Sequence, residues 1–293
     1  MSTIMSQIPL RMSRSVFRGI TAITSKPRDL PYSTALHKDE KTPTTVDIAD
    51  VKHHSKIKEQ WWDVNGPMKA LHAFNLLRVP LVRDGLVQVP PERKSCTPLL
   101  GKKILDVGCG GGILSMPLAK LGGDVTGIDA SKELVDMAKE HSETNPPATG
   151  NKPTYIYTSI EEHATNHTNH YDGVVASEII EHIDNDKKEL FVKSCIHTLK
   201  PGGRIFFTTP TRTKISQFTS IFIAEYVLRA IPVGTHQYEK FTTPTELTFL
   251  LERNGCHVES VFGIFYHPLQ NKWEWITSTA FFFAIQAVKL EEE

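Results

Sequence analysis

The chain has 293 residues, of which 40% are hydrophobic and 9% aromatic, and its 33 basic residues balance its 33 acidic residues. This composition is typical of a globular chain with one large or two small domains. The zero net charge argues against a protein that binds nucleic acid by neutralising phosphates. The four cysteines form no CxxC pair, which argues against a structural zinc site or a disulfide framework.

The first 40 residues differ in composition from the rest. Five basic residues and no acidic residue precede Asp29, among several serines and threonines. An arginine-rich, serine-rich and acid-free start is typical of a mitochondrial transit peptide, although a mildly basic disordered tail has the same composition. We therefore expect residues 1–40 to be a transit peptide and linker, and residues 41–293 to form the folded domain.

The remaining chain predicts a helical cap followed by alternating strands and helices. Residues 41–100 form the expected cap, with two helices between residues 55 and 90 that Gly66 and Pro67 separate. From Lys103 onward, short apolar runs alternate with helical patterns. Strands are expected at residues 104–107, 125–128, 154–158, 173–176, 204–208, 258–266 and 279–288, and helices at residues 113–121, 187–199 and 244–254. This rhythm predicts a Rossmann-like α/β fold, with a mostly parallel seven-stranded sheet and helices on both faces.

An apolar insertion interrupts this rhythm after the fifth predicted strand. It covers residues 212–242, and within it apolar side chains such as Phe218 and Phe222 recur at helical spacing over residues 213–232. Such a helix can lie on a membrane surface, or it can pack on the core as an amphipathic lid. The pattern leaves both interpretations open.

A glycine-rich loop follows the first predicted strand. Gly108 and Gly110 lie where this strand turns into a helix, so a ligand can approach the backbone there. Ile113 stands where a dinucleotide fingerprint of the form G-x-G-x-x-G has its third glycine. The spacing therefore resembles the loop with which Rossmann-like methyltransferases bind S-adenosylmethionine (AdoMet).

Two acidic residues accompany this loop. Asp129 ends the second predicted strand, where a carboxylate can accept hydrogen bonds from both hydroxyls of a ribose. Asp106 ends the first strand, where it can meet the ammonium group of AdoMet or simply hold the loop. Together with the loop, these acids predict a cofactor site at the carboxyl edge of the sheet.

Candidate catalytic residues follow the fourth predicted strand. If residues 178–182 form a helical turn, Glu178, Glu181 and His182 stand at positions i, i+3 and i+4 on one face. Oxygen and nitrogen ligands without thiolates suit Mg²⁺. Alternatively these residues only cap the turn, or His182 acts as the general base that removes a proton from an acceptor hydroxyl.

Five stretches together resemble a known family. They carry the motifs Trp-Trp-Asp and Gly-Thr-His as well as the glycine loop, and they extend in order over about residues 50–290. These stretches are residues 61–72, 75–78, 103–115, 176–183 and 234–241. This combination resembles the ubiquinone-biosynthesis O-methyltransferases, which are class I AdoMet-dependent enzymes.

The resemblance implies a function. It implies methylation of phenolic hydroxyls on polyprenylated dihydroxybenzoate and demethylubiquinol, at two steps of ubiquinone biosynthesis. The expected location is the matrix face of the mitochondrial inner membrane, as a peripheral protein in a complex with other proteins of the pathway, without a nucleic-acid partner. Two alternatives stay open. One is a C-methyltransferase of the same pathway, and the other is a non-catalytic AdoMet-binding scaffold subunit.

The resemblance also implies roles for residues. It implies AdoMet contacts at Arg78, Gly108, Asp129 and Ser177, and a Mg²⁺ site at Glu178, Glu181 and His182. Independently of the family, Arg78 lies on an apolar helix edge, where it can pair with the AdoMet carboxylate or be an ordinary surface arginine. Trp61 and Trp62 can line the acceptor pocket or serve only in packing.

Overall fold

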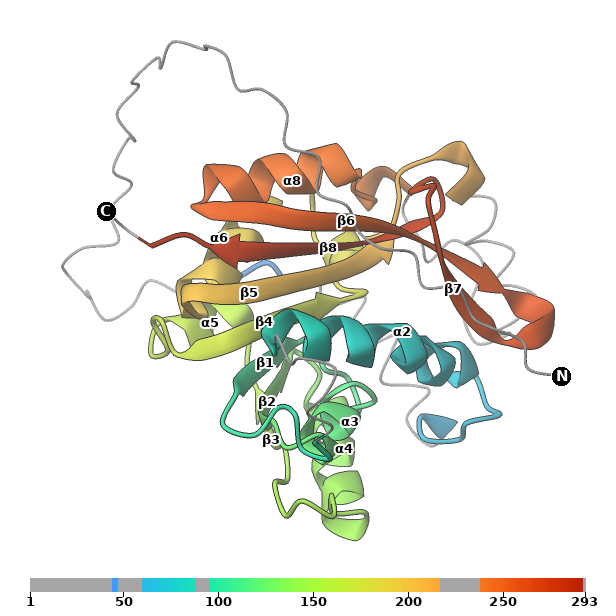
Figure 1. Ribbon diagram of the computed structural model, residues 1–293, viewed down its shortest axis with the longest axis vertical. Helices are drawn as coiled ribbons and strands as arrows, with labels where there is room; N and C mark the ends of the chain where they lie inside the picture. The colour runs from blue at the N-terminus through green and yellow to red at the C-terminus, as the bar shows by residue number, and fades with distance from the viewer. Residues whose placement is uncertain (1–43, 47–59, 88–94, 217–237, 292–293) are drawn as a thin grey trace, which may run out of the picture. The chain divides into compact units, whose positions relative to one another are not determined.

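The computed structural model describes residues 44–46, 60–87, 95–216 and 238–291 (Figure 1). These residues belong to one compact unit, Thr42–Glu293. The expected transit peptide, residues 1–40, lies outside the described residues, as does most of the apolar segment 213–232. None of the described helices combines the length and the apolar character that crossing a bilayer requires.

The described strands form one mixed sheet. They are β1 (Lys103–Val107), β2 (Asp124–Asp129), β3 (Thr154–Tyr157), β4 (Tyr171–Ser177), β5 (Leu199–Pro210), β6 (Cys256–His267), β7 (Lys272–Ile276) and β8 (Phe282–Lys289). Their order across the sheet is β3-β2-β1-β4-β5-β8-β6-β7. The first five strands pair in parallel, whereas β8, β6 and β7 each pair antiparallel to their neighbours. All seven predicted strands are confirmed, but the described sheet has an eighth.

The eighth strand is β7, which pairs with β6 at one edge of the sheet. The two strands are joined by a short turn in which Asn271 adopts a left-handed conformation with φ 47°. Within β7, Trp273 is buried between the exposed Lys272 and Glu274. The prediction of seven strands was wrong because a five-residue strand with a single buried residue gives a weak pattern.

Helices cover both faces of the sheet. On one face lie α2 (Lys69–Leu86), α3 (Ser115–Lys120) and α4 (Lys132–Thr144), and on the other α5 (Ile160–Ala164), α6 (Lys188–Thr198) and α8 (Pro244–Arg253). Figure 1 shows α8 and α4 at opposite ends of the view. Of the two helices expected between residues 55 and 90, the second corresponds to α2. Most of the first lies outside the described residues, and residues 60–68 form turns around Gly66.

Helix α8 confirms the helix that was predicted at residues 244–254. The Thr243 hydroxyl accepts a hydrogen bond from the Glu246 backbone N–H at 3.2 Å, and the Glu246 carboxylate accepts one from the Thr243 N–H at 2.8 Å. Pro244 occupies the first turn, and Gly255 follows the helix with φ 82°. These capping contacts fix both ends of the helix from its own sequence.

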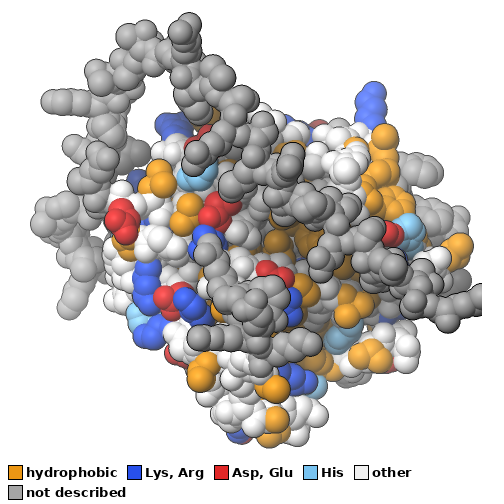
Figure 2. All heavy atoms as spheres, viewed as in Figure 1, with side chains coloured by type: hydrophobic (Ala, Val, Ile, Leu, Met, Phe, Trp, Pro, Cys, Tyr) orange, Lys and Arg blue, Asp and Glu red, His pale blue; other side chains and the backbone are white. Residues whose placement is uncertain are grey.

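Charges of both signs mix on the surface. Figure 2 shows basic and acidic side chains interspersed over one face of the molecule. Local ion pairs follow from this distribution, such as Arg204 with Glu259 at 2.7 Å and Lys200 with Asp172 at 2.8 Å. Because such pairs are exposed or half-buried, each adds little to stability.

Helix α2 lies unusually close to β5. A Cβ atom at Gly85 would lie 2.5 Å from Cε1 of Phe206, which is fully buried. A glycine in a helix costs backbone entropy, so its presence here follows from the close approach of the Phe206 ring. This contact sets how closely the C-terminal end of α2 packs on β5.

We expect Gly85→Ala to lower the free energy of unfolding by about 1–3 kcal/mol, because the added methyl group overpacks the contact with Phe206. Leu76→Ala in the same helix is the control, since Leu76 is 74% exposed and its truncation should change stability by less than about 0.5 kcal/mol. Urea denaturation measures both. Equal effects of the two substitutions would contradict this view of the contact.

Candidate functional site

The candidate site lies where β1, β2 and β4 end. Because these strands are parallel, their carboxyl ends meet at the same edge of the sheet, which is where open α/β folds bind ligands. This edge brings together Asp106 in β1, Asp129 at the end of β2 and Ser177 at the end of β4. The sequence prediction of one cofactor site at this edge agrees with that arrangement.

The glycine loop folds tightly onto the end of β2. The backbone N–H groups of Gly108 and Cys109 both donate to the Ile128 carbonyl, at 2.9 and 3.0 Å. Gly108 and Gly110 have φ values of 72° and 51°, in the left-handed region that other residues rarely adopt. The loop thus forms a tight turn with little side-chain bulk.

Trp61 lies directly against this loop. A Cβ atom at Gly110 would lie 2.7 Å from Cζ2 of Trp61, and one at Gly111 would lie 2.5 Å from its Cδ1. Of the two interpretations of Trp61, packing agrees with this position, since the indole is buried against the loop and a small apolar cluster. Contact between residues fifty positions apart leaves no local sequence signal.

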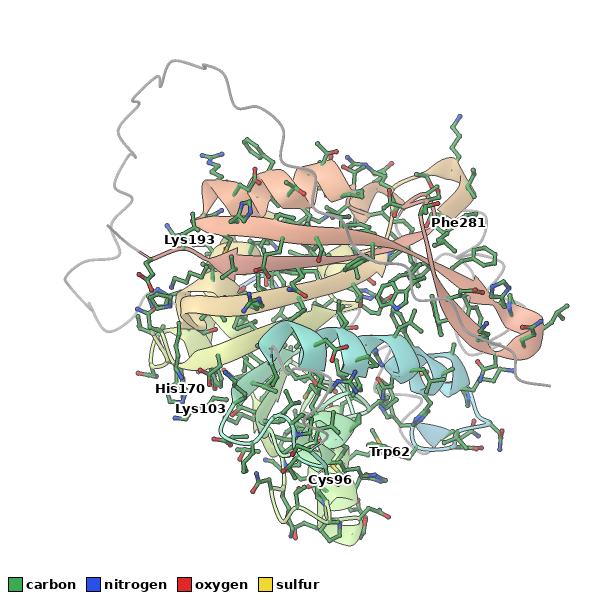
Figure 3. The ribbon with its side chains drawn as sticks, in the orientation of Figure 1. Trp62, Cys96, Lys103, His170, Lys193 and Phe281 are labelled. Atoms are coloured by element: carbon green, nitrogen blue, oxygen red, sulfur yellow. The ribbon has the colours of Figure 1, made fainter. Side chains whose placement is uncertain are left out.

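Trp62 fixes the same turn to α4. Its ring stacks on His141 with centroids 3.5 Å apart and an interplanar angle of 2°. Figure 3 shows Trp62 between the N-terminal end of α2 and helices α3 and α4. The turn is therefore held at two places, by Trp61 against the glycine loop and by Trp62 against α4.

Asp129 organises the edge of the loop. One carboxylate oxygen accepts a hydrogen bond from the Gly110 N–H at 2.8 Å, and the other accepts one from the Ser131 N–H at 2.7 Å. These bonds fix the orientation of the carboxylate beside Gly110. The side chain is thus an acceptor group held at the place where the sequence predicts a ribose contact.

Asp106 is buried beneath the loop. The Ser115 hydroxyl donates to its carboxylate at 2.6 Å, and burial raises the pKa of Asp106 to about 6, while the Ser115 bond and the nearby Arg78 charge oppose this rise. Both expected roles, holding the loop and meeting an ammonium group, are compatible with this position.

Arg78 is buried at the same edge, with 5% of its surface exposed. Its Nη1 donates to the Ser177 hydroxyl at 3.0 Å, and its Nη2 donates to the Leu71 carbonyl and to Asn75 Oδ1, at 3.0 and 2.7 Å. Burial lowers the pKa of Arg78 to about 10, and the charges of Glu178 and Asp106 oppose this shift. The alternative of an ordinary surface arginine is wrong, and Arg78 and Ser177 contact each other.

The turn after β4 differs from the expected helix. Only Ile180–His182 form a short 3₁₀ helix, η2, and Glu178 precedes it with φ 55°. The helical spacing that placed Glu178, Glu181 and His182 on one face therefore does not apply, because Glu178 lies outside the helix. Glu181 is instead held by Thr209, whose hydroxyl donates to Oε2 of Glu181 at 3.0 Å.

Two carboxyl groups lie close together in this turn. Burial, followed by the charge of Glu181, raises the pKa of Glu178 to about 8, and burial also raises the pKa of Glu181. The charge of His182 opposes both shifts, so all three side chains are electrostatically linked. Perturbed acids of this kind are typical of functional sites.

The site fits AdoMet better than it fits a metal. Near the loop, Nε of Arg78 and Nε1 of Trp61 are buried donors without a hydrogen-bond partner in the described residues, and both can bind an acceptor-rich ligand. By contrast, no three His, Cys, Asp or Glu side chains in the described part of the chain come together as metal ligands. Glu178, Glu181 and His182 therefore do not form a ready three-ligand site.

Comparisons with known proteins agree with this geometry. A family model described as a methyltransferase domain matches residues 82–261. The chain is 38% identical to the mitochondrial ubiquinone biosynthesis O-methyltransferase of Rattus norvegicus over 280 residues, which cover 96% of this chain and 79% of that protein. It is 38% identical to the ubiquinone biosynthesis O-methyltransferase of Sinorhizobium fredii over 236 residues, which cover 80% of this chain and 92% of that protein.

A solved structure shares the fold. The magnesium protoporphyrin IX methyltransferase of Synechocystis, crystallised with bound S-adenosylmethionine, superposes with a TM-score of 0.54 at 19% identity, over 84% of this chain and 100% of that one. At this identity the likeness concerns the fold alone. The sequence relatives are closer, and by their identity over most of the chain it belongs to the ubiquinone biosynthesis O-methyltransferases, a family of AdoMet-dependent enzymes with the class I methyltransferase fold.

Proposed function

We propose that the chain transfers a methyl group from AdoMet to a phenolic hydroxyl of polyprenylated catechol or hydroquinol intermediates in ubiquinone biosynthesis. The observation that carries this proposal is the position of the Arg78–Ser177 pair. It joins helix α2 to the end of β4, directly before the acidic turn that begins at Glu178. The names of the two curated relatives support the substrate class.

The cofactor side of the reaction depends on binding and orientation. When bound, AdoMet supplies an electrophilic methyl group on its sulfonium sulfur. Arg78 suits the methionyl carboxylate because it is a buried cation with an unpartnered Nε–H. Asp129 suits the ribose hydroxyls because its carboxylate is an acceptor held at the end of β2.

The acceptor side needs a group that takes a proton. A phenolic oxygen attacks more readily as its proton leaves, and a base with a pKa near the operating pH is the most effective. Glu178, with a pKa raised to about 8, and the adjacent His182 both suit this role. Glu181 is buried and accepts a hydrogen bond from the Thr209 hydroxyl, which holds it in the turn.

Mg²⁺ assistance stays a prediction and no step is assigned to it. The described residues do not gather three metal ligands. In its favour, Oε1 of Glu178 is buried without a hydrogen-bond partner in the described residues. A nearby cation would also oppose the rise in the pKa of this carboxyl and favour its ionised, metal-binding form. Removing and restoring the ion tests this directly.

We expect residues 41–293 to transfer labelled methyl from AdoMet to a short-chain prenylated dihydroxybenzoate. Glu181→Ala should lower turnover by about 100-fold or more while AdoMet still binds, because Glu181 lies on the acceptor side. EDTA should abolish transfer and Mg²⁺ restore it if the metal takes part. Transfer that resists EDTA would assign the chemistry to Glu178 and His182 alone.

The controls separate this proposal from its alternatives. A methylated carbon in the product instead of a methyl ether would indicate a C-methyltransferase. AdoMet binding without any transfer to the phenolic acceptor would contradict the proposed reaction and favour the scaffold role. Glu189→Ala in α6, at an exposed ion pair with Arg253, should leave turnover unchanged.

We expect Glu178→Gln to stabilise the protein increasingly as pH rises. Because the pKa of Glu178 is raised from 4.5 to about 8 by burial and by Glu181, the folded state favours the protonated carboxyl. The stability that protonated Glu178 contributes is fully present below its pKa in the unfolded state. It is lost as the pH rises through its pKa in the folded state. Melting temperatures measured near pH 5 and near pH 9 check this, and an equal difference between variant and wild type at both values would contradict it.

The location follows from the relatives and the N-terminal composition. One curated relative is named as mitochondrial, and residues 1–40 have the composition of a transit peptide. We propose a mitochondrial location with residues 1–40 as the transit peptide. Peripheral association with the matrix face of the inner membrane through segment 213–232, and a complex with other proteins of the pathway, rest on the resemblance and on the apolar pattern.

We expect a C-terminally tagged full-length chain to sediment with mitochondria in shortened form, since a transit peptide is removed on import. Within mitochondria, alkaline carbonate should release it from the membrane fraction if its association is peripheral. A cytosolic chain with an intact N-terminus would contradict the targeting proposal. Changing Arg11 and Arg14 to glutamate is the matched control and should abolish import.

A further inference from the structure

Trp61 is almost completely buried beside the glycine loop, with 6% of its surface exposed. Its indole packs with Met68, Ile113 and Leu134. A Cβ atom at Gly111 would lie 2.6 Å from its Nε1. The indole nitrogen itself, and not only the carbon edge of the ring, therefore lies over the loop.

The indole N–H of Trp61 has no hydrogen-bond partner in the described residues. The fold satisfies another buried tryptophan fully, since Nε1 of Trp273 donates to the Ala70 carbonyl at 2.8 Å. Nε1 of Trp62 is also unpartnered, but its ring is stacked on His141. Because a buried donor without a partner is costly, the N–H of Trp61 beside a cofactor loop points to an acceptor on the ligand.

The position of this donor is linked to Arg78 through Asn75 and Ile113, by two hydrogen bonds and one packing contact. Nδ2 of Asn75 donates to the Ile113 carbonyl at 2.7 Å, and Oδ1 of the same residue accepts from Arg78. Ile113 packs against Trp61. The backbone of Trp61 is held as well, since Nε2 of His72 donates to its carbonyl at 3.0 Å. Helix α2 thus positions both Arg78 and the turn that carries Trp61.

We propose that the Trp61 indole N–H donates a hydrogen bond to the methionyl carboxylate of AdoMet, beside Arg78; this inference rests on the proposed function. An indole N–H is a donor only, so it needs an acceptor. The carboxylate is the acceptor of AdoMet that carries a negative charge, and it is the group that the buried Arg78 cation attracts. The ribose hydroxyls instead suit Asp129, which accepts.

A pair of ligands separates the amino-acid end from the rest of the cofactor. S-adenosylhomocysteine carries this end, with its ammonium and carboxylate groups, whereas 5′-methylthioadenosine has the adenosine and the sulfur without it. Of the two groups only the carboxylate can accept from an indole N–H. Isothermal titration calorimetry should show that Trp61→Phe weakens the binding of S-adenosylhomocysteine about 10-fold, as expected for a lost hydrogen bond to a charged group. The affinity for 5′-methylthioadenosine should change little. Trp62→Phe is the matched control and should leave the ratio of the two affinities unchanged.

Nuclear magnetic resonance of the wild type gives a readout that does not depend on the variant's stability. The chain has four tryptophans, so ¹⁵N-labelled indole groups give few signals, and substituting the other three assigns that of Trp61 by elimination. S-adenosylhomocysteine should move the Trp61 indole proton downfield, and 5′-methylthioadenosine should not.

The outcomes distinguish a failure of the proposed Trp61 hydrogen bond from a failure of the proposed function. Equal weakening of both ligands by Trp61→Phe would mean that the indole only packs, and would overturn the inference. Unchanged affinities, or an indole signal that both ligands move alike, would also overturn it. If the wild type binds neither ligand, the proposed function itself fails. If the wild type prefers S-adenosylhomocysteine and Trp61→Phe loses that preference, the proposed Trp61 hydrogen bond is supported.

Discussion

Arg78 joins helix α2 to the carboxyl ends of the sheet, and the charges of the site depend on this position. Its guanidinium is bonded to Ser177 at the end of β4 and to two groups of its own helix, and it lies 4.9 Å from the centre of the Phe74 ring. A cation so buried is stable only if its surroundings supply acceptors and negative charge. The ionised forms of Asp106 and Glu178 attract this cation, and its charge in turn opposes the rise in the pKa of both acids.

The ionised forms of these acids also destabilise the fold. Burial raises the pKa of Asp106 and of Glu178, so at neutral pH their ionised forms oppose folding to the extent that Arg78 does not compensate. Removing a cation from such a cluster leaves uncompensated charge, whereas removing an acid relieves it. The ionised form of Glu178 is thus the one that burial disfavours, and under the proposed function it is also the one that would accept a proton.

Local sequence signals predicted much of the fold, and contacts distant in sequence explain what they did not. Helix α8 was predictable because Thr243, Pro244 and Glu246 cap it from within, and the glycine loop was predictable from its place after β1. The left-handed backbone of Glu178 carries no such signal, because the residue is not a glycine. Two contacts depend instead on how α2 lies on the sheet: that of Trp61 with the loop and that of Arg78 with Ser177.

The Trp61–Trp62 turn connects helix α2 to the glycine loop and to α4. Trp61 contacts the loop, Trp62 stacks on α4, and the carbonyl of Trp61 accepts from His72 of α2. Because Gly110 and Gly111 lack side chains, the indole can reach the loop backbone, and the loop cannot take this form with larger residues unless the indole moves. The glycines and the tryptophan are thus one structural unit, so the stretch with the Trp-Trp-Asp motif and the glycine loop specify the cofactor site together.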